Sequence, residues 1–262
     1  MDGRSTFASL PSFFLLILAL SLPFWALGSV TRYELWPGLP VSALMVVCPV
    51  IVASILVCRQ LGGAGVSALL GRALDWRRIT AKRWYVPTLL LAPGVMVLTY
   101  GLMRWMGRPL PEAPEVPLAW VLVLLPVFLV AASCEELGWS GYAIEPLQDR
   151  WGALRAALML GGVWAAWHLV PLLQARRPRG WIVGWCLATL ASRVLIVWIY
   201  NNTGKSVFAA SLYHAVTNLS WTSFPNQGSH YDPRVAGPIL ALAAALVAVV
   251  WGPRTLVRWG SA

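Results

Sequence analysis

Charged residues are scarce in this sequence. Only 11% of its 262 residues are charged and 58% are hydrophobic, whereas a soluble domain carries about 25% charged residues. The shortage extends along the whole chain, which argues against a soluble domain at either end. Sixteen Trp and 19 Pro also suit a membrane protein. We therefore expect a single integral membrane domain over residues 1–262.

Cysteine and repeat signals are equally weak. The four cysteines form no CxxC pair and lie in or beside apolar runs: Cys48, Cys58, Cys134 and Cys186. We interpret them as small core residues, not as disulfide partners or a metal knuckle. The chain also lacks an HExxH zinc-protease motif and any internal repeat of the kind that many transporters show.

Long apolar runs dominate what is present. A spanning helix needs about 20 mostly apolar residues, and the candidates are 7–27, 39–57, 85–103, 118–145, 153–173, 181–200, 206–222 and 235–252. The first run resembles a signal peptide, but residues 25–29 form a poor cleavage site, so we expect a retained span. The sequence predicts an all-α, polytopic transmembrane bundle of about eight spans.

The net charge of +10 concerns topology and lipids. No basic face with aromatic stacking is present, so we expect anionic membrane lipids and no nucleic acid as partners. Segment 58–84 has one acid, Asp75, against six basic residues: Arg59, Arg72, Arg77, Arg78, Lys82 and Arg83. This bias predicts a cytoplasmic loop and, with eight spans, cytoplasmic termini in a multi-pass cell-membrane protein. The basic cluster at 176–179 opposes the bias locally.

Ionisable residues inside predicted spans are costly and are candidates for function. The sequence has few of them: Glu135, Glu136, Glu145, His168, Arg193 and His214. The remaining histidine, His230, falls in the loop before the last span, where we expect it to be solvated. The search for chemistry therefore centres on residues 118–222.

The paired carboxylates lie within segment 133–142. Adjacent residues of a helix diverge by about 100°, so Glu135 and Glu136 cannot face the same cavity. One is expected to face a substrate while the other binds a supporting partner. Gly138 and Gly141 are expected to let another backbone approach this helix closely.

The histidines lie on two other predicted spans. Trp164 lies one turn before His168, and Asn218 lies one turn after His214, so each pair shares a helix face. A carboxylate and an imidazole can together hold and deprotonate water. Histidine and asparagine can donate hydrogen bonds to an oxyanion. The set therefore suggests hydrolysis, with these groups meeting in a wet cavity inside the membrane.

Plainer explanations exist for each feature alone. A histidine in a span is often just a hydrogen-bonded core residue, and Asn four residues after His is common by chance. A Glu pair can form a structural ion pair or belong to a proton relay. The three features together are much more specific than any one of them.

In order, spacing and placement, the motifs across 118–222 resemble those of the CAAX protease and bacteriocin-processing (CPBP) family of intramembrane proteases. That family carries EExxxR, FxxxH and HxxxN on separate spans of a roughly eight-helix bundle. The matching residues here are Glu135 and Glu136, Trp164 to His168, and His214 to Asn218. The resemblance implies that Glu135 and His168 activate water, that His214 and Asn218 stabilise the oxyanion, and that Glu136 orients the site from behind.

Two departures from the family pattern concern residues near the carboxylates. Trp164 stands where Phe is usual, which is a mild change. Ser140 stands where the motif Arg is expected, and an unpaired buried Glu136 would be costly. We hypothesise that Arg193, on the sixth predicted span, supplies the missing charge.

The need for a metal stays open on the sequence. Glu135, His168 and His214 could bind zinc with water in the fourth position. The same residues could equally activate water without a metal, which we slightly favour.

Two rival functions follow from the same residues. Residues 138–141 match the GxSG of rhomboid-like serine proteases, with Ser140 as nucleophile and His214 as base, but this leaves both glutamates unused. Alternatively, the chain is a transporter, or a catalytically inactive scaffold or immunity-type protein that retains the fold. We predict an intramembrane endopeptidase acting on a peptide or membrane-associated protein at the cytoplasmic side. Neither the substrate nor the oligomeric state follows, although the pair Gly180 and Gly184 is suited to close helix packing.

Overall fold

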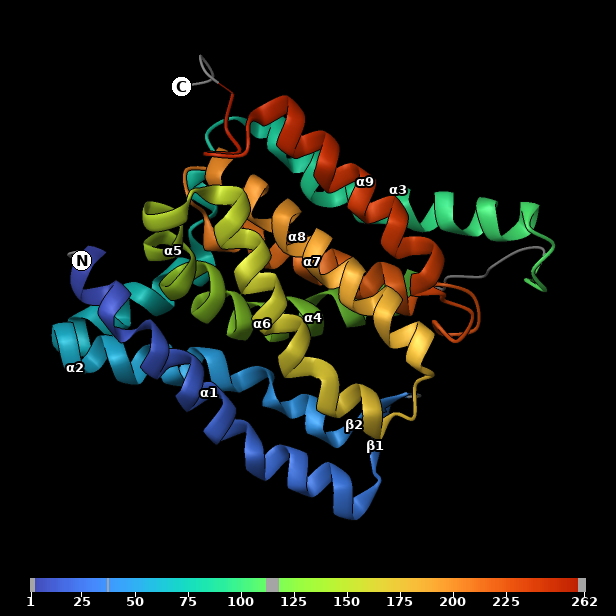
Figure 1. The fold of residues 1–262 in the computed structure, drawn as a ribbon, viewed down its shortest axis with the longest axis horizontal. Coiled ribbons are helices and arrows are strands. Elements are labelled where there is room, and N and C mark those ends of the chain that lie inside the picture. Colours follow the sequence, from blue (N-terminus) through green and yellow to red (C-terminus); the bar gives the residue numbers. More distant parts are fainter. Residues whose placement is uncertain (1–2, 37, 112–117, 259–262) are drawn as a thin grey trace.

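The computed structural model in Figure 1 describes residues 3–36, 38–111 and 118–258 and is almost entirely helical. The long helices are α1 (Gly3–Thr31), α2 (Cys48–Gly71), α3 (Tyr85–Trp105), α4 (Leu118–Gly138), α6 (Ala153–Gln174), α7 (Arg179–Asn202), α8 (Val207–Thr222) and α9 (Pro233–Trp251). Two short antiparallel strands, β1 (Glu34–Trp36) and β2 (Leu39–Pro40), follow α1, and a 3-10 helix, η1 (Val41–Val47), leads into α2. The prediction of an all-α membrane bundle is confirmed.

The described residues contain seven helices long and apolar enough to cross a membrane. The predicted span 206–222 forms α8, but this helix has 16 residues, or about 24 Å at 1.5 Å per residue. That is shorter than the roughly 30 Å hydrocarbon core. Because α8 packs against α3, α4 and α7, its backbone is enclosed by protein. The chain is thus a multi-pass membrane protein with one short internal helix.

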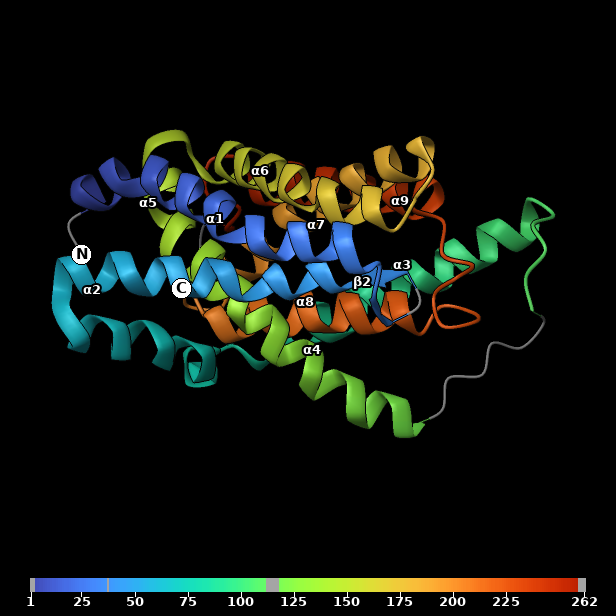
Figure 2. The same ribbon diagram turned by 90° about the horizontal axis from the view of Figure 1, so that it is seen from below.

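The predicted loop 58–84 is wrong in its first half, because residues 58–71 are helical. Gly62 has φ 66° and ψ −166°, a conformation that glycine adopts at little cost. The chain turns back there, as Figure 2 shows at the far end of α2. A Cβ on Gly65 would lie only 3.0 Å from the Val57 side chain, which confirms the reversal. Residues 60–71 carry no charge, so the returning segment can pack against the bundle.

The second half of segment 58–84 consists of short 3-10 turns: η2 (Arg72–Leu74), η3 (Trp76–Arg78) and η4 (Lys82–Trp84). In Figures 1 and 2 the start of α1 and the end of α9 lie at the same end of the molecule as the bend of α2. Which end faces the cytoplasm stays a prediction.

Helix α7 forms the centre of the bundle. In an apolar 18-residue stretch of α7, 72% of the residues are buried, against 22% in the corresponding stretch of α1. It packs against α6, α8 and α9. A Cβ on Gly237 of α9 would lie 2.7 Å from the Gly184 carbonyl oxygen, so only glycine allows this approach. The glycines at 180 and 184 therefore face α9 of the same chain.

The polypeptide continues from α4 through a π-helical turn, η5 (Trp139–Ala143), into α5 (Ile144–Trp151). The predicted span 118–145 thus extends further and contains an irregular turn, a feature frequent at functional sites. A Cβ on Gly138 would lie 2.8 Å from the Pro49 carbonyl oxygen of α2. The predicted close backbone approach at Gly138 is confirmed, and it holds the end of α4, just after the paired glutamates, against α2.

Two smaller predictions also meet the structure here. All four cysteines are free. Cys48 is buried as a core residue, whereas Cys58 is exposed near the bend of α2, so its interpretation as a core residue is wrong. His230 lies in the loop before α9 and is partly exposed. In the same loop Asp232 caps α9, and hydrogen bonds from Arg234 lower the pKa of its carboxyl group.

Candidate active site

The structure encloses Glu136 completely and surrounds it with donors. Its side chain is 0% exposed. Arg193 Nη1 of α7 donates to Oε2 at 2.8 Å, and His214 Nδ1 of α8 lies 3.1 Å from Oε1. Ser140 Oγ, one turn further along, also donates to Oε2. Three separate elements thus converge on this one carboxylate.

Arg193 is the cation buried beside Glu136. Its side chain is 0% exposed, and its Cζ lies 4.2 Å from the centre of the Trp164 ring, within cation–π range. The guanidinium therefore comes from α7, while the position of the missing motif arginine holds the Ser140 hydroxyl. The Arg193 guanidinium on α7 and the Ser140 hydroxyl on η5 thus both donate hydrogen bonds to Glu136.

Glu135 has a different environment although it is the neighbouring residue. It is 4% exposed, and its Oε2 accepts hydrogen bonds from Trp164 Nε1 at 2.7 Å and Trp139 Nε1 at 3.3 Å. Both donors are uncharged. No ion pair involves Glu135 among residues 3–36, 38–111 and 118–258, so its charge is not neutralised by direct contact.

The two histidines are held through Nδ1. His168 Nδ1 lies 2.9 Å from the Trp164 carbonyl oxygen, so we assign the Nδ1–H tautomer, which leaves a lone pair on Nε2. Since Glu136 accepts from Nδ1 of His214, that residue can donate from Nε2 only as an imidazolium. Each imidazole therefore has a fixed orientation and one ring nitrogen available to a ligand.

Trp164 lies among the other candidate residues. Its ring centre is 5.7 Å from that of His168 and 5.1 Å from that of His214. It also contacts Arg193 and donates to Glu135. The structure thus brings residues from α4, α6, α7 and α8 around one indole, in one layer of the bundle.

Several polar atoms of this cluster remain available. No described residue hydrogen-bonds to Glu135 Oε1, to His168 Nε2 or to His214 Nε2. In the described chain, some polar atoms have neither a hydrogen-bond partner nor accessible surface. None of these three atoms belongs to that group, so each has accessible surface. Asn218 lies one turn after His214 and is half-buried, and its side-chain amide likewise has accessible surface. Each of the four residues therefore keeps a polar group with some accessible surface and no hydrogen-bond partner among the described residues.

The possible zinc ligands do not form a site as they lie. Across the part of the chain that the structure describes, no three His, Cys, Asp or Glu side chains could hold a metal ion together. Glu135, His168 and His214 are included in that statement. The donor set does not fit a bound zinc ion.

The serine-protease alternative finds little support. Ser140 is 1% exposed, and its hydroxyl donates to Glu136. His214 is bound to the same carboxylate through Nδ1, and no described hydrogen bond joins it to Ser140. A buried serine hydroxyl that is not hydrogen-bonded to the proposed histidine base is a poor nucleophile.

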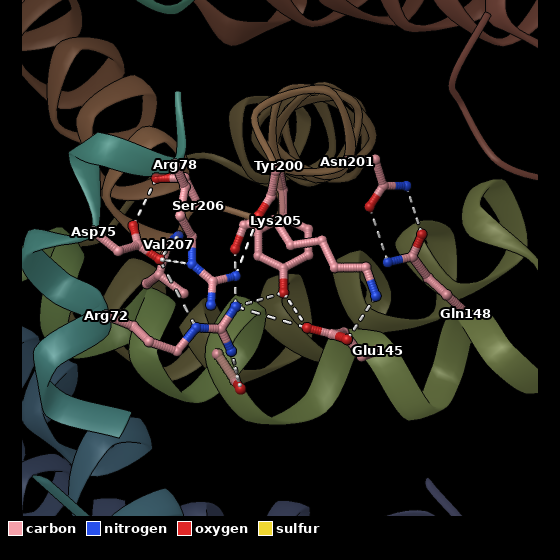
Figure 3. Close-up of polar contacts among 12 residues, drawn as sticks. Arg72, Asp75, Arg78, Glu145, Gln148, Tyr200, Asn201, Lys205, Ser206 and Val207 are labelled. Carbon is pink, nitrogen blue, oxygen red and sulfur yellow. Dashed lines mark hydrogen bonds and ion pairs between the residues drawn. The ribbon is translucent and has the colours of Figure 1, made fainter. Parts of the chain in front are cut away.

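A second polar cluster lies at the end of the bundle where α2 turns back, and Figure 3 shows it. Arg72 donates to the Gly141 carbonyl oxygen at 2.9 Å and to the Tyr200 hydroxyl at 2.8 Å. Glu145 accepts from Lys205 Nζ at 2.7 Å and lies 3.7 Å from Arg72. We call this group the Arg72 cluster.

The Arg72 cluster continues to the start of α8. Asp75 accepts from the Ser206 hydroxyl at 2.6 Å and from the Phe208 backbone N–H at 3.0 Å. A carboxylate at this position satisfies free N–H groups of the helix and complements its dipole. The cluster therefore fixes where α8 begins, and through α8 the position of His214.

Comparison with known proteins adds a match to a protein family over part of the chain. Residues 117–220 match the family described as Type II CAAX prenyl endopeptidase Rce1-like. The predicted resemblance to the CPBP family is confirmed. The matched range contains the residues that correspond to the three CPBP motifs, with Ser140 in place of the first motif's Arg, and both partners of the Glu136–Arg193 pair.

A relative agrees with this match to the CPBP family. The chain is 26% identical over 192 residues to a protein of Methanococcus maripaludis named CAAX prenyl protease 2, covering 66% of this chain and 68% of the relative. Both matches support a membrane peptidase of the CAAX prenyl endopeptidase type.

Sequence reasoning missed two parts of this arrangement. Trp139 donates to Glu135, and its position four residues later on the same helix face was the available signal. Arg72 and Asp75 were predicted to lie in a cytoplasmic loop. Their side chains instead contact η5, α5, α7 and the start of α8.

Proposed function

We propose that this chain is an intramembrane endopeptidase in which Glu135 and His168 activate water, and His214 and Asn218 stabilise the oxyanion. The observation that carries the proposal is the contrast between the two glutamates. Glu136 is paired with a buried arginine and a histidine, whereas Glu135 meets only neutral indole donors and keeps one oxygen accessible. A buried carboxylate without a cationic partner is the better general base.

The reaction can be written with all protons assigned. Water held between Glu135 Oε1 and His168 Nε2 attacks the scissile carbonyl carbon and gives one proton to Glu135. The carbonyl oxygen becomes an oxyanion, which accepts hydrogen bonds from His214 Nε2–H and the Asn218 amide. As the carbon–nitrogen bond breaks, Glu135 returns the proton to the leaving amine nitrogen. A carboxylic acid and an amine are released.

The roles proposed for Glu136 and Arg193 are positional. Glu136 accepts from His214 Nδ1, which directs Nε2 away from it and stabilises the imidazolium needed for donation. Arg193 balances the second unit of negative charge in a site without bulk water. Glu136 and Arg193 thus support the oxyanion side of the site without contacting the substrate.

A lipid-bearing peptide is the substrate class that we propose, following the name of the relative from Methanococcus maripaludis. An apolar cavity of about 350 Å³ lies between α3 and α8. Its lining includes Leu219 and Ser220, which follow Asn218 directly, and Met96 and Val97 across from them. A hydrocarbon chain can occupy such a cavity while its peptide lies at the polar groups.

The loss of the motif arginine at Ser140 favours one alternative, a catalytically inactive membrane scaffold or immunity-type protein. The ion pair between Glu136 and Arg193 weakens this alternative, since the negative charge keeps a buried partner.

Peptide cleavage by the purified protein tests the proposal. The probe is a farnesylated peptide with a CaaX end, compared with the same peptide without the lipid and with a leader-type peptide. We expect Glu135→Gln to lower kcat by at least about 100-fold, as loss of a general base does. Glu145→Gln, the same chemical change in the Arg72 cluster, should retain kcat within about threefold when corrected for folded protein.

Each other outcome has a definite meaning. Absence of cleavage by the wild type, with folded protein and all three peptides, would favour the inactive alternative. Loss of cleavage in Ser140→Ala with full activity in Glu135→Gln would establish the serine mechanism instead.

A further inference from the structure

Two tryptophans from different elements donate to the same oxygen of Glu135. Trp139 belongs to the π-helical turn one turn after the glutamate, and Trp164 belongs to α6. Their Nε1 atoms lie 3.3 Å and 2.7 Å from Oε2. No described residue donates to Oε1, which has accessible surface. The two carboxylate oxygens are therefore not equivalent.

Packing fixes both indole rings. Trp139 is 0% exposed and meets Phe13 and Trp167 edge-on, with ring centres 5.7 Å and 5.6 Å away. Trp164 is held between the Arg193 guanidinium and the two histidine rings. A buried indole N–H has a single direction of donation and no acceptor capacity. The two rings can thus hold a carboxylate without exchanging protons with it.

We propose that Trp139 and Trp164 are positioning residues that occupy Oε2 of Glu135 and leave Oε1 as the oxygen that takes the proton from water. This inference rests on the proposed function, because it assigns roles within that mechanism. It also gives a purpose to the tryptophan at position 164, since a phenylalanine there could not donate.

The chemistry favours neutral donors at this position. A guanidinium or ammonium partner would stabilise the carboxylate anion and weaken it as a base. An indole N–H orients the carboxylate at a smaller cost in basicity. Glu136 shows the opposite case, in which a charged partner holds an acid that takes no proton.

Replacement of the indoles by phenylalanine removes the N–H group and keeps an aromatic ring. We expect Trp164→Phe to lower kcat about tenfold and Trp139→Phe about threefold, in line with a charge-assisted hydrogen bond and a longer one. KM should stay within about twofold in both variants, because neither ring binds the peptide in this mechanism.

Trp181→Phe is the matched control for a lost buried indole hydrogen bond. Trp181 is 9% exposed and donates to the Tyr231 carbonyl oxygen at 3.3 Å. It lies near the start of α7, well before Arg193, the residue of α7 that contacts Glu136. Its kcat should equal that of the wild type within about twofold. Equal kcat in Trp164→Phe and Trp181→Phe would overturn the inference.

A spectroscopic measurement separates this inference from the proposed function. In protein labelled with ¹⁵N at the indole nitrogens, Glu135→Gln should shift the N–H signals of Trp139 and Trp164 and leave that of Trp181 in place. Unmoved signals for both would refute the indole pair even if the enzyme is active. Shifted signals in Glu135→Gln, together with no peptide cleavage by the wild-type protein, would refute the proposed function and retain the hydrogen bonds.

Discussion

Glu136 and Glu145 lie on the same helical run, yet their surroundings differ in kind. Glu136 is 0% exposed, and its ion-pair partner Arg193 is also 0% exposed. The Glu145 side chain is 36% exposed and pairs with Lys205, which is 53% exposed. Both carboxylates join helices that are distant in sequence. Only the first does so where water cannot replace a missing partner.

The difference teaches how much each ion pair is worth. An exposed pair contributes about 0–1 kcal/mol, because water and salt screen it. A buried pair gives little net stability when complete, but removal of one partner costs about 3–5 kcal/mol. The Glu136 pair therefore restricts which sequences can fold, whereas the Glu145 pair tolerates substitution.

Arg193→Leu should show the largest effect. It leaves Glu136 buried with only His214 and the Ser140 hydroxyl as partners, and we expect a loss of about 3–5 kcal/mol in the free energy of unfolding. Thermal and denaturant unfolding in detergent measure it. Unfolding at the wild-type midpoint would show that Arg193 does not compensate the charge.

The double variant Ser140→Arg with Arg193→Leu sharpens this result. It moves the guanidinium to the position where the CPBP motif has it, within one turn of Glu136. Recovery of stability beyond that of Arg193→Leu alone would show that the charge, and not the helix that carries it, is what Glu136 requires.

Arg72→Met should have an intermediate effect. The variant retains an apolar stem but loses the bonds to the Gly141 carbonyl and the Tyr200 hydroxyl. We expect the free energy of unfolding to fall by about 2 kcal/mol, typical for hydrogen bonds from a charged group. The same unfolding assay applies, and a loss as large as that of Arg193→Leu would remove the contrast between the two clusters.

Lys205→Met should have the smallest effect. Its ion pair with Glu145 is largely exposed, so a loss below about 1 kcal/mol is expected, and less at high salt. Comparison at low and high ionic strength checks this. A salt-independent loss of several kcal/mol would mean that the pair is buried when the protein is in a bilayer.

The sequence was sufficient for the parts of the fold that depend on apolar length and on motif order. The helices, the close approach at Gly138 and the family resemblance follow from patterns that a single chain displays. The candidate residues on α4, α6 and α8 do lie together, although their catalytic roles stay proposals.

Other features depend on partners that no local pattern reveals. The reversal at Gly62 lies in an uncharged stretch that reads as the edge of a span. Tryptophan in a membrane protein reads as an interfacial or core residue, so the bonds from Trp139 and Trp164 to Glu135 appear only in three dimensions. Arg72 reads as a topology signal, yet its side chain is only 19% exposed.

The shortness of α8 affects how protons and water reach the site. His214 is the eighth residue of the helix, so it lies roughly 10 Å from the end that Asp75 caps. A hydrolase needs only one route for water. A short route from a single membrane face avoids a continuous chain of water molecules between the two faces of the membrane. Because α8 is short, even an imidazole at its middle lies only roughly 10 Å from the capped end, so water can reach the reaction centre from one membrane face without crossing the bilayer.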